Sequence, residues 1–134
     1  MTQTTSEARY LFDTAALIDI YHGRERVRLY FDRLFEGSAT AYISPLSEAE
    51  LWMGLRPNEL ARHEALLAYF QALPLTSAAG RLAGEWMRRL RPEGLGWTDA
   101  LLVATAAVAD VAVLTRDRRL AETLGAEAQI ILYA

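Results

Sequence analysis

The chain has 134 residues, 17 of them acidic and 14 of them arginine, and it contains neither lysine nor cysteine. This length suits one domain with a sizeable buried core, so we expect residues 1–134 to form a single domain. The lack of cysteine excludes disulfide frameworks, thiolate catalysis and cysteine-based metal sites, and the lack of lysine excludes Schiff-base chemistry and a P-loop. The net charge of −3 at first argues against a nucleic-acid partner, because phosphate binding normally leaves a basic footprint.

Nothing in the sequence is typical of a targeting signal or a membrane span. Residues 1–9 are polar and contain no apolar stretch before a cleavage site. The longest nearly uncharged apolar run, residues 100–109, is shorter than the ~20 residues that a bilayer requires. We therefore expect a cytoplasmic protein without membrane contacts.

Short β-like runs alternate with helical segments along the chain, and glycines or prolines stand where many of these segments are expected to end. In chain order we expect a strand at 10–12, helices at 14–21 and 26–35, a strand at 40–44, helices at 47–55 and 58–73, a brief strand at 75–76, a helix at 77–90, a loop at 91–96, a helix at 98–110, a strand at 111–115, a helix at 118–124 and a strand at 129–133. Strands that alternate with helices of this length predict an α/β fold of three layers, α/β/α, with a central parallel sheet of four to five strands.

Four acidic residues stand where expected strands end or helices begin: Asp13, Glu50, Asp99 and Asp117. From Asp99 a helix climbs ~17 Å at about 1.5 Å per residue, and the following strand returns over about the same distance, which places Asp117 beside Asp99. In a parallel sheet, Asp13 and Glu50 belong to the same carboxyl edge, where ligands of open α/β sheets bind. The sequence therefore predicts that the four carboxylates converge at one place.

Each acid also has a purely structural interpretation. Residues 47–50 (Ser-Glu-Ala-Glu) match a capping box, Asp13 and Asp117 are candidate N-caps, and Asp99 would favour a helix dipole. Four like charges at one edge, however, repel each other unless a cation is present. Oxygen ligands without cysteine or a suitably placed histidine fit Mg²⁺ or Mn²⁺ better than zinc.

Other side chains carry weaker expectations. We expect His22 and His63 at the surface or at helix ends and Asp19 at a solvated helix position, and we keep Asp110 as a spare metal ligand. The helix at 98–110 is apolar on every face and should be buried. For four large side chains we expect core packing first and a partner face second: Trp52, Met53, Tyr69 and Phe70.

Four segments resemble the motifs of PIN-domain ribonucleases, and of the VapC toxins in particular. They are residues 10–14, 43–55, 98–106 and 114–120. In the second segment the match gives the acidic role to Glu50 and not to Glu48. The four segments follow the family's order and spacing along the whole chain. The chain departs from the pattern at Leu120, where an aromatic residue is common, and in its lack of lysine.

The resemblance implies a parallel sheet between helices, an acidic Mg²⁺ or Mn²⁺ site and endonucleolytic hydrolysis of RNA. It implies that the metal-binding, catalytic acids are Asp13, Glu50, Asp99 and Asp117 and that the supporting hydroxyls are Thr14 and Thr115. It also implies a cognate VapB-type antitoxin that blocks the site, a toxin homodimer and a toxin–antitoxin hetero-oligomer.

Two alternative functions stay open. An aspartate-based phosphatase or phosphotransfer domain also uses an aspartate after its first strand. Such domains normally use a lysine, which this chain lacks, and the phosphatase motif needs a second aspartate where this chain has Ala15. A non-catalytic module of the same fold would bind RNA or a protein, but degenerate members should have lost acids that this chain keeps.

The charge balance changes once the four acids are set apart. Subtracting 4 from 17 acids leaves 13 against 14 arginines, a balance of +1 instead of −3. Three arginines flank Asp117 and are candidate RNA contacts: Arg116, Arg118 and Arg119. Without lysine, all basic contacts to phosphate fall to arginine, whose planar fork suits phosphate oxygens. The acidic net charge is therefore compatible with an RNA substrate.

Overall fold

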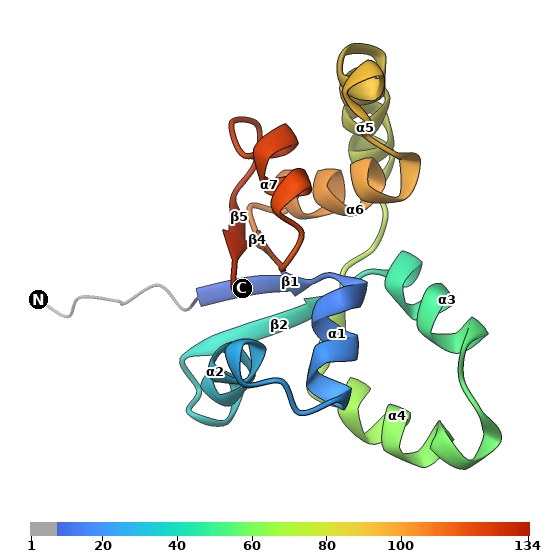
Figure 1. The fold of residues 1–134 in the computed structure, drawn as a ribbon, viewed down its shortest axis with the longest axis vertical. Coiled ribbons are helices and arrows are strands. Elements are labelled where there is room, and N and C mark those ends of the chain that lie inside the picture. The colour runs from blue at the N-terminus through green and yellow to red at the C-terminus, as the bar shows by residue number, and fades with distance from the viewer. Residues whose placement is uncertain (1–7) are drawn as a thin grey trace, which may run out of the picture.

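The computed structural model describes residues 8–134, in which a sheet of five parallel strands has the order β3-β2-β1-β4-β5 (Figure 1). The strands are β1 (Ala8–Phe12), β2 (Ala39–Ile43), β3 (Phe70–Ala72), β4 (Ala112–Thr115) and β5 (Ile130–Leu132). The helices are α1 (Thr14–Tyr21), α2 (Glu25–Phe35), α3 (Pro45–Met53), α4 (Leu60–Leu67), α5 (Ser77–Leu90), α6 (Trp97–Val108) and α7 (Arg118–Leu124), with short 3-10 turns at η1 (Pro57–Glu59) and η2 (Arg91–Glu93).

Alternate residues of the central strands enter two separate cores, one on each face of the sheet. Leu11 of β1 and Val113 of β4 pack with residues of α5, α6 and α7. Phe12 and Leu114 pack with residues of α1 and α2. The two-residue period of a strand produces this division. The predicted three-layer α/β/α architecture is thereby confirmed, with five strands in the sheet.

Three helices have the bounds that the sequence predicts, namely α1, α5 and α7. Each begins after a polar residue whose side chain accepts a hydrogen bond from the first turn: Asp13, Thr76 and Asp117. Such N-caps satisfy backbone N–H groups that have no partner within the helix. The agreement at these helices follows from start signals that are local in sequence.

The expectations around the third strand are wrong. The helix expected at 58–73 ends at Leu67, and the strand is β3 and not residues 75–76. Phe70 is buried and packs edge to face on Phe12, with ring centroids 5.1 Å apart. The backbone of β3 pairs with β2 at the edge of the sheet. A short apolar run fits the periodicity of a helix as well as that of a strand, so pairing with the sheet decides its structure.

Helix α3 begins at Pro45, two residues earlier than expected. Ser44 is its N-cap and accepts a hydrogen bond from the backbone N–H of Leu46 at 3.1 Å. Proline suits this first position because its missing N–H would have had no partner in the helix. The capping box expected at 47–50 is wrong, because Ser47 lies inside the helix and is fully buried.

Helix α6 carries Asp99 in its first turn. Its central turns are buried, as expected, whereas Val108 near its end is exposed. The hydroxyl of Thr105 donates to the Leu101 carbonyl at 2.7 Å, which satisfies it within its own helix.

In the described part of the chain, no helix is both long and apolar enough to cross a membrane.

Candidate active site

The four predicted acids line one cavity of about 400 Å³ at the carboxyl edge of the sheet. Asp13 follows β1, Glu50 lies in α3 after β2, Asp99 is in the first turn of α6, and Asp117 follows β4. Four different elements therefore deliver their carboxylates to the same place, as the spacing predicts. The structure shows this juxtaposition, and the roles of the acids in metal binding and catalysis stay predictions.

Asp13 is the most constrained of the four acids. Its carboxylate accepts a hydrogen bond from the backbone N–H of Ala16 at 2.7 Å and another from the hydroxyl of Thr115. Burial raises the pKa of Asp13 to about 6, against the lowering effect of these two hydrogen bonds. The nearby charges of Asp99 and Asp117 also contribute to this raised pKa.

Thr115, the last residue of β4, connects two of the acids. Its hydroxyl donates to Asp13 and accepts from the backbone N–H of Asp117 at 3.0 Å. The Asp117 carboxylate in turn caps α7 by accepting from the Leu120 N–H at 3.1 Å. Because Thr115 is fully buried, this arrangement is held by the core.

Thr14 supports Glu50 from across the cavity. Its hydroxyl donates to Glu50 Oε1 at 3.1 Å and lies 2.9 Å from the hydroxyl oxygen of Ser47. Ser47 therefore joins α3 to α1 and does not cap a helix. The structure thus gives both Thr14 and Thr115 direct contacts to the acids.

Asp99 is exposed at the rim of the cavity, on the first turn of α6. Partial removal from water raises its pKa, and the charges of Asp117 and Glu50 raise it further. Beside it, Trp97 is 53% exposed and also lines the cavity. Sequence reasoning missed Trp97; the signal was an aromatic residue two positions before an acid at a helix start.

The four acids form no ion pair within residues 8–134. The three ion pairs in this part of the chain involve other acids: Glu85, Glu127 and Asp19. None of the residues that line the cavity is a histidine or an arginine. A donor set made only of oxygens fits Mg²⁺ or Mn²⁺. Within the described residues, no group of three such side chains stands close enough together to hold a metal ion.

The three candidate RNA-contacting arginines have different surroundings. Arg116 forms an ion pair with Asp19 at 3.4 Å, whereas Arg118 is exposed. Arg119 lines a small cavity together with Asp99 and Asp117. A Cβ at Gly94, whose φ is +94°, would lie 2.6 Å from the Arg119 guanidinium, so the glycine leaves room for this side chain. A role for any of the three in RNA binding stays a prediction.

Two expectations about aspartates are wrong. Asp19 is not solvated: it is 4% exposed and accepts a hydrogen bond from the Tyr133 hydroxyl at 2.5 Å. Asp110 is not a spare ligand, because it lies before β4, whereas Asp117 follows the same strand. The two therefore stand at opposite ends of the sheet. Only the return of the chain end to α1 reveals the partner of Asp19.

Expectations about the larger side chains are also partly wrong. His63 is buried and hydrogen bonded to the Tyr21 hydroxyl, whereas His22 stands at the end of α1 as expected. Among the four side chains expected in the core, Phe70 is buried. The others are exposed, at 60%, 84% and 50% for Trp52, Met53 and Tyr69.

The PIN domain family model matches residues 10–125 of the chain, a range that contains all four acids. The chain belongs to the PIN-domain family. Ribonuclease VapC19 of Mycobacterium tuberculosis is 31% identical to this PIN domain over 111 residues, which cover 81% of this chain and 89% of the relative. Ribonuclease VapC10 of the same organism is 41% identical over 75 residues, which cover 54% of this chain and 56% of the relative. The resemblance to VapC-type PIN domains is thereby confirmed.

Solved structures share the fold of this PIN domain. One chain of the DNA-bound VapBC structure from Salmonella typhimurium aligns with a TM-score of 0.76 at 22% identity. The alignment covers 95% of the present chain and 99% of the matched chain. FitAcB from Neisseria gonorrhoeae aligns with a TM-score of 0.73 at 23% identity, covering 91% and 96%. These alignments confirm the PIN-like α/β/α architecture.

Proposed function

We propose that this PIN domain is a metal-dependent endoribonuclease that hydrolyses RNA and acts as the toxin of a VapBC-type pair. The observation that carries the proposal is the cavity at the carboxyl edge of the sheet. Four acids from four separate elements line it, and none of them has an ion-pair partner in the described residues. The names of the two ribonuclease relatives support RNA as the substrate.

The four carboxylates would hold Mg²⁺ or Mn²⁺. These ions prefer oxygen ligands, and their positive charge would offset the negative charge of the carboxylates. When bound, such an ion supplies a water of lowered pKa and positive charge beside the phosphate oxygens. Asp13 is oriented by Ala16 and Thr115, and Glu50 is oriented by Thr14. These hydrogen bonds restrict the orientations of the Asp13 and Glu50 carboxylates.

We propose hydrolysis by water and not attack by the RNA 2′-hydroxyl. Metal-free ribonucleases usually rely on general acid–base side chains, and no histidine lines this cavity. The test is to incubate the purified protein with RNA and Mn²⁺ and to identify the ends of the fragments. We expect 5′-phosphate and 3′-hydroxyl ends. Fragments ending in a 2′,3′-cyclic phosphate would contradict the mechanism.

Asp99→Ala tests the site itself. This acid is exposed at the rim, so its removal should leave folding intact while cleavage falls to background. The matched control is Asp32→Ala, which removes an exposed aspartate on α2 that does not line the cavity. A folded Asp99→Ala protein that still cleaves RNA would rule out the proposed site.

We further propose a cognate VapB-type antitoxin, a toxin homodimer and a hetero-oligomer of the two proteins, in the cytoplasm where RNA is available. The proposal is supported by the structural neighbours, which include VapBC and FitAB structures. Co-expression with a VapB-type protein encoded beside this chain should yield one complex, in which cleavage is suppressed. Light scattering of the toxin alone measures whether it is a dimer.

The alternatives have less support. Membership of the PIN-domain family argues against a phosphatase or phosphotransfer domain, for which the chain also lacks the lysine. A non-catalytic RNA- or protein-binding module would not need four uncompensated carboxylates in one cavity. Binding of RNA without any cleavage in Mg²⁺ or Mn²⁺ would favour that module.

A further inference from the structure

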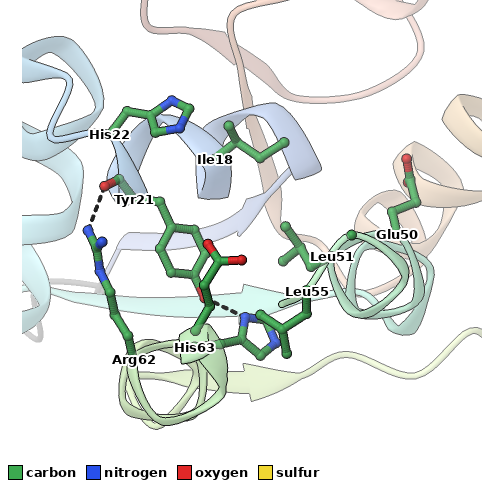
Figure 2. Close-up of a pocket in the computed structure, with 10 residues that line it drawn as sticks. Ile18, Tyr21, His22, Glu50, Leu51, Leu55, Arg62 and His63 are labelled. Carbon is green, nitrogen blue, oxygen red and sulfur yellow. Dashed lines mark hydrogen bonds between the residues drawn. The ribbon is translucent and has the colours of Figure 1, made fainter. Parts of the chain in front are cut away.

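A second cavity, of about 270 Å³, lies beside the acidic one and takes no part in the mechanism above. It is bounded by α1, by α3 and the residues that follow it, and by the η1–α4 segment (Figure 2). Apolar walls come from Ile18, Leu51 and Leu55. The other walls come from aromatic and charged side chains, namely Tyr21, Arg62, His63 and Glu59. Apolar walls with a few convergent polar groups are typical of small-ligand sites.

We propose that this cavity binds one nucleobase of the RNA strand whose phosphate lies in the acidic cavity. The inference rests on the proposed ribonuclease function and names the part of the substrate that the neighbouring cavity holds. We refer to it below as the base pocket, defined by Tyr21, Arg62, His63 and Glu59.

The base pocket adjoins the acidic cavity through Glu50, which lines both. In Figure 2 Glu50 stands at the edge of the base pocket, on α3, apart from the group formed by Tyr21 and His63. A base and its phosphate are joined through a single ribose. Two cavities that share one wall residue can therefore hold the phosphate and a base of the same short stretch of RNA.

Tyr21 and Arg62 give the base pocket flat surfaces in fixed orientations. The Arg62 guanidinium lies 5.5 Å from the centroid of the Tyr21 ring and donates to the Tyr21 carbonyl at 2.7 Å. The Tyr21 hydroxyl is hydrogen bonded to the ring of His63, which is 2% exposed. RNA-binding proteins stack unpaired bases on aromatic rings and on arginine planes. These contacts hold the Tyr21 ring and the Arg62 guanidinium in place, and a base would stack on one of the two.

Glu59 adds a hydrogen-bond acceptor to the base pocket. Its Oε1 accepts from the backbone N–H of Arg56 at 3.0 Å, which fixes the carboxylate and leaves the second oxygen available. A carboxylate accepts hydrogen bonds from the amino groups that bases carry on their edges. The base pocket should therefore favour a base with an exocyclic amino group over uracil.

Cleavage of a random-sequence RNA pool tests the proposal, with the ends of the products read by sequencing. We expect the wild-type protein to prefer amino-bearing bases at one position beside the cleaved bond. Arg62→Ala and Glu59→Gln should weaken this preference and lower kcat/KM on the preferred RNA about tenfold, the scale of one lost base contact. The matched control is Arg81→Ala, because Arg81 is an exposed arginine on α5 that does not line the base pocket.

A synthetic RNA that lacks the base at that position provides the second measurement. Wild type and Arg62→Ala should cleave this abasic RNA at the same rate. The substitution removes only the contact with the base, and the abasic RNA cannot make that contact with either protein. Arg62 and Glu59 are exposed, so both variants should fold, and thermal unfolding checks this.

The outcomes separate the two levels of the proposal. If the wild-type protein cleaves RNA but the variants keep its base preference and rate, the base pocket is wrong and the ribonuclease function stands. If the variants cleave normally but no longer bind the antitoxin, the cavity holds a protein segment and the proposal is overturned. If the wild-type protein cleaves no RNA, the ribonuclease function fails and the base pocket fails with it.

Discussion

The side chain of Asp13 is buried at the end of β1, where two hydrogen bonds hold it and the charges of Asp99 and Asp117 oppose its ionisation. Its pKa of about 6 in the folded protein lies above the ~3.9 of an unfolded aspartate. The folded, metal-free protein therefore binds more protons than the unfolded chain between these values. Its stability should fall as the pH rises from about 4 to 6, because this one carboxyl must ionise.

Asp13→Asn tests this directly. We expect the substitution to abolish cleavage and to raise the free energy of unfolding of the metal-free protein by about 1–2 kcal/mol at pH 7. At pH 4, where Asp13 is protonated in the folded protein, the gain should disappear. Urea unfolding at both pH values measures this, with the exposed Asp32→Asn as control. An equal loss of stability at both pH values would contradict the assignment.

The single hydroxyl oxygen of Thr115 takes part in two hydrogen bonds. In Thr115→Val the shape is kept, but Asp13 loses a donor and the Asp117 N–H loses its acceptor. We expect stability to fall by about 1–3 kcal/mol and kcat to fall because the acids are no longer fixed. Thr115→Ser keeps the hydroxyl and should recover most of both. If valine and serine behave alike, the hydroxyl does not position the acids.

At the scale of elements, the end of the chain is tied to α1. Tyr133, which follows β5, donates to the buried Asp19 of α1, and Arg116 after β4 pairs with the same carboxylate. Burial and the hydrogen bond to Asp19 raise the pKa of Tyr133, so its hydroxyl stays protonated as the donor. These two contacts join α1 to the residues that follow β4 and β5.

Tyr133→Phe removes the hydroxyl alone. The buried Asp19 would lose its strongest donor, so we expect the free energy of unfolding to fall by about 1–3 kcal/mol. Tyr69→Phe is the control, because Tyr69 is half exposed and its substitution should stay within about 0.5 kcal/mol of wild type. Denaturant midpoints with unchanged slopes measure both. Equal midpoints for the two variants would show that Asp19 is satisfied without Tyr133.

Elements differ in how far the sequence alone predicts them. Helix α1 follows a capping aspartate and α7 another, and both have the expected bounds. The edge strand β3 is only three residues long, and its apolar pattern also fits the helix that was expected there. A cap is a local signal, whereas an edge strand is stable only when its neighbour is in place.

At the scale of the whole molecule, four carboxylates at one edge determine how the protein should respond to divalent cations. We expect Mn²⁺ to bind and to stabilise the folded protein by about 2.7 kcal/mol at a concentration 100 times the Kd. Glu50→Gln or Asp117→Asn should weaken binding strongly. Asp110→Asn is the matched control, since this exposed aspartate lies at the opposite end of β4. Calorimetric titration measures binding, and equal affinity in all four proteins would exclude the acidic cavity.

The sequence by itself predicted where the four acids lie and most of the fold. The length of α6 and β4 was enough to bring Asp99 and Asp117 to one edge, because both elements have a fixed rise per residue. The rule that parallel strands share a carboxyl edge placed Asp13 and Glu50 there as well. These inferences depend on geometry that every helix and strand obeys.

The tertiary structure alone decided which side chains meet across the chain. Asp19 and Tyr133 are 114 positions apart, Thr115 and Asp13 are 102 apart, and Tyr21 and His63 are 42 apart. No local period or cap signals such contacts, because a buried polar group finds its partner only after the elements have packed. The net charge of −3 suggested at the outset that RNA was an improbable partner. The fold concentrates four of the negative charges in one cavity, and that cavity is where we propose that RNA is cleaved.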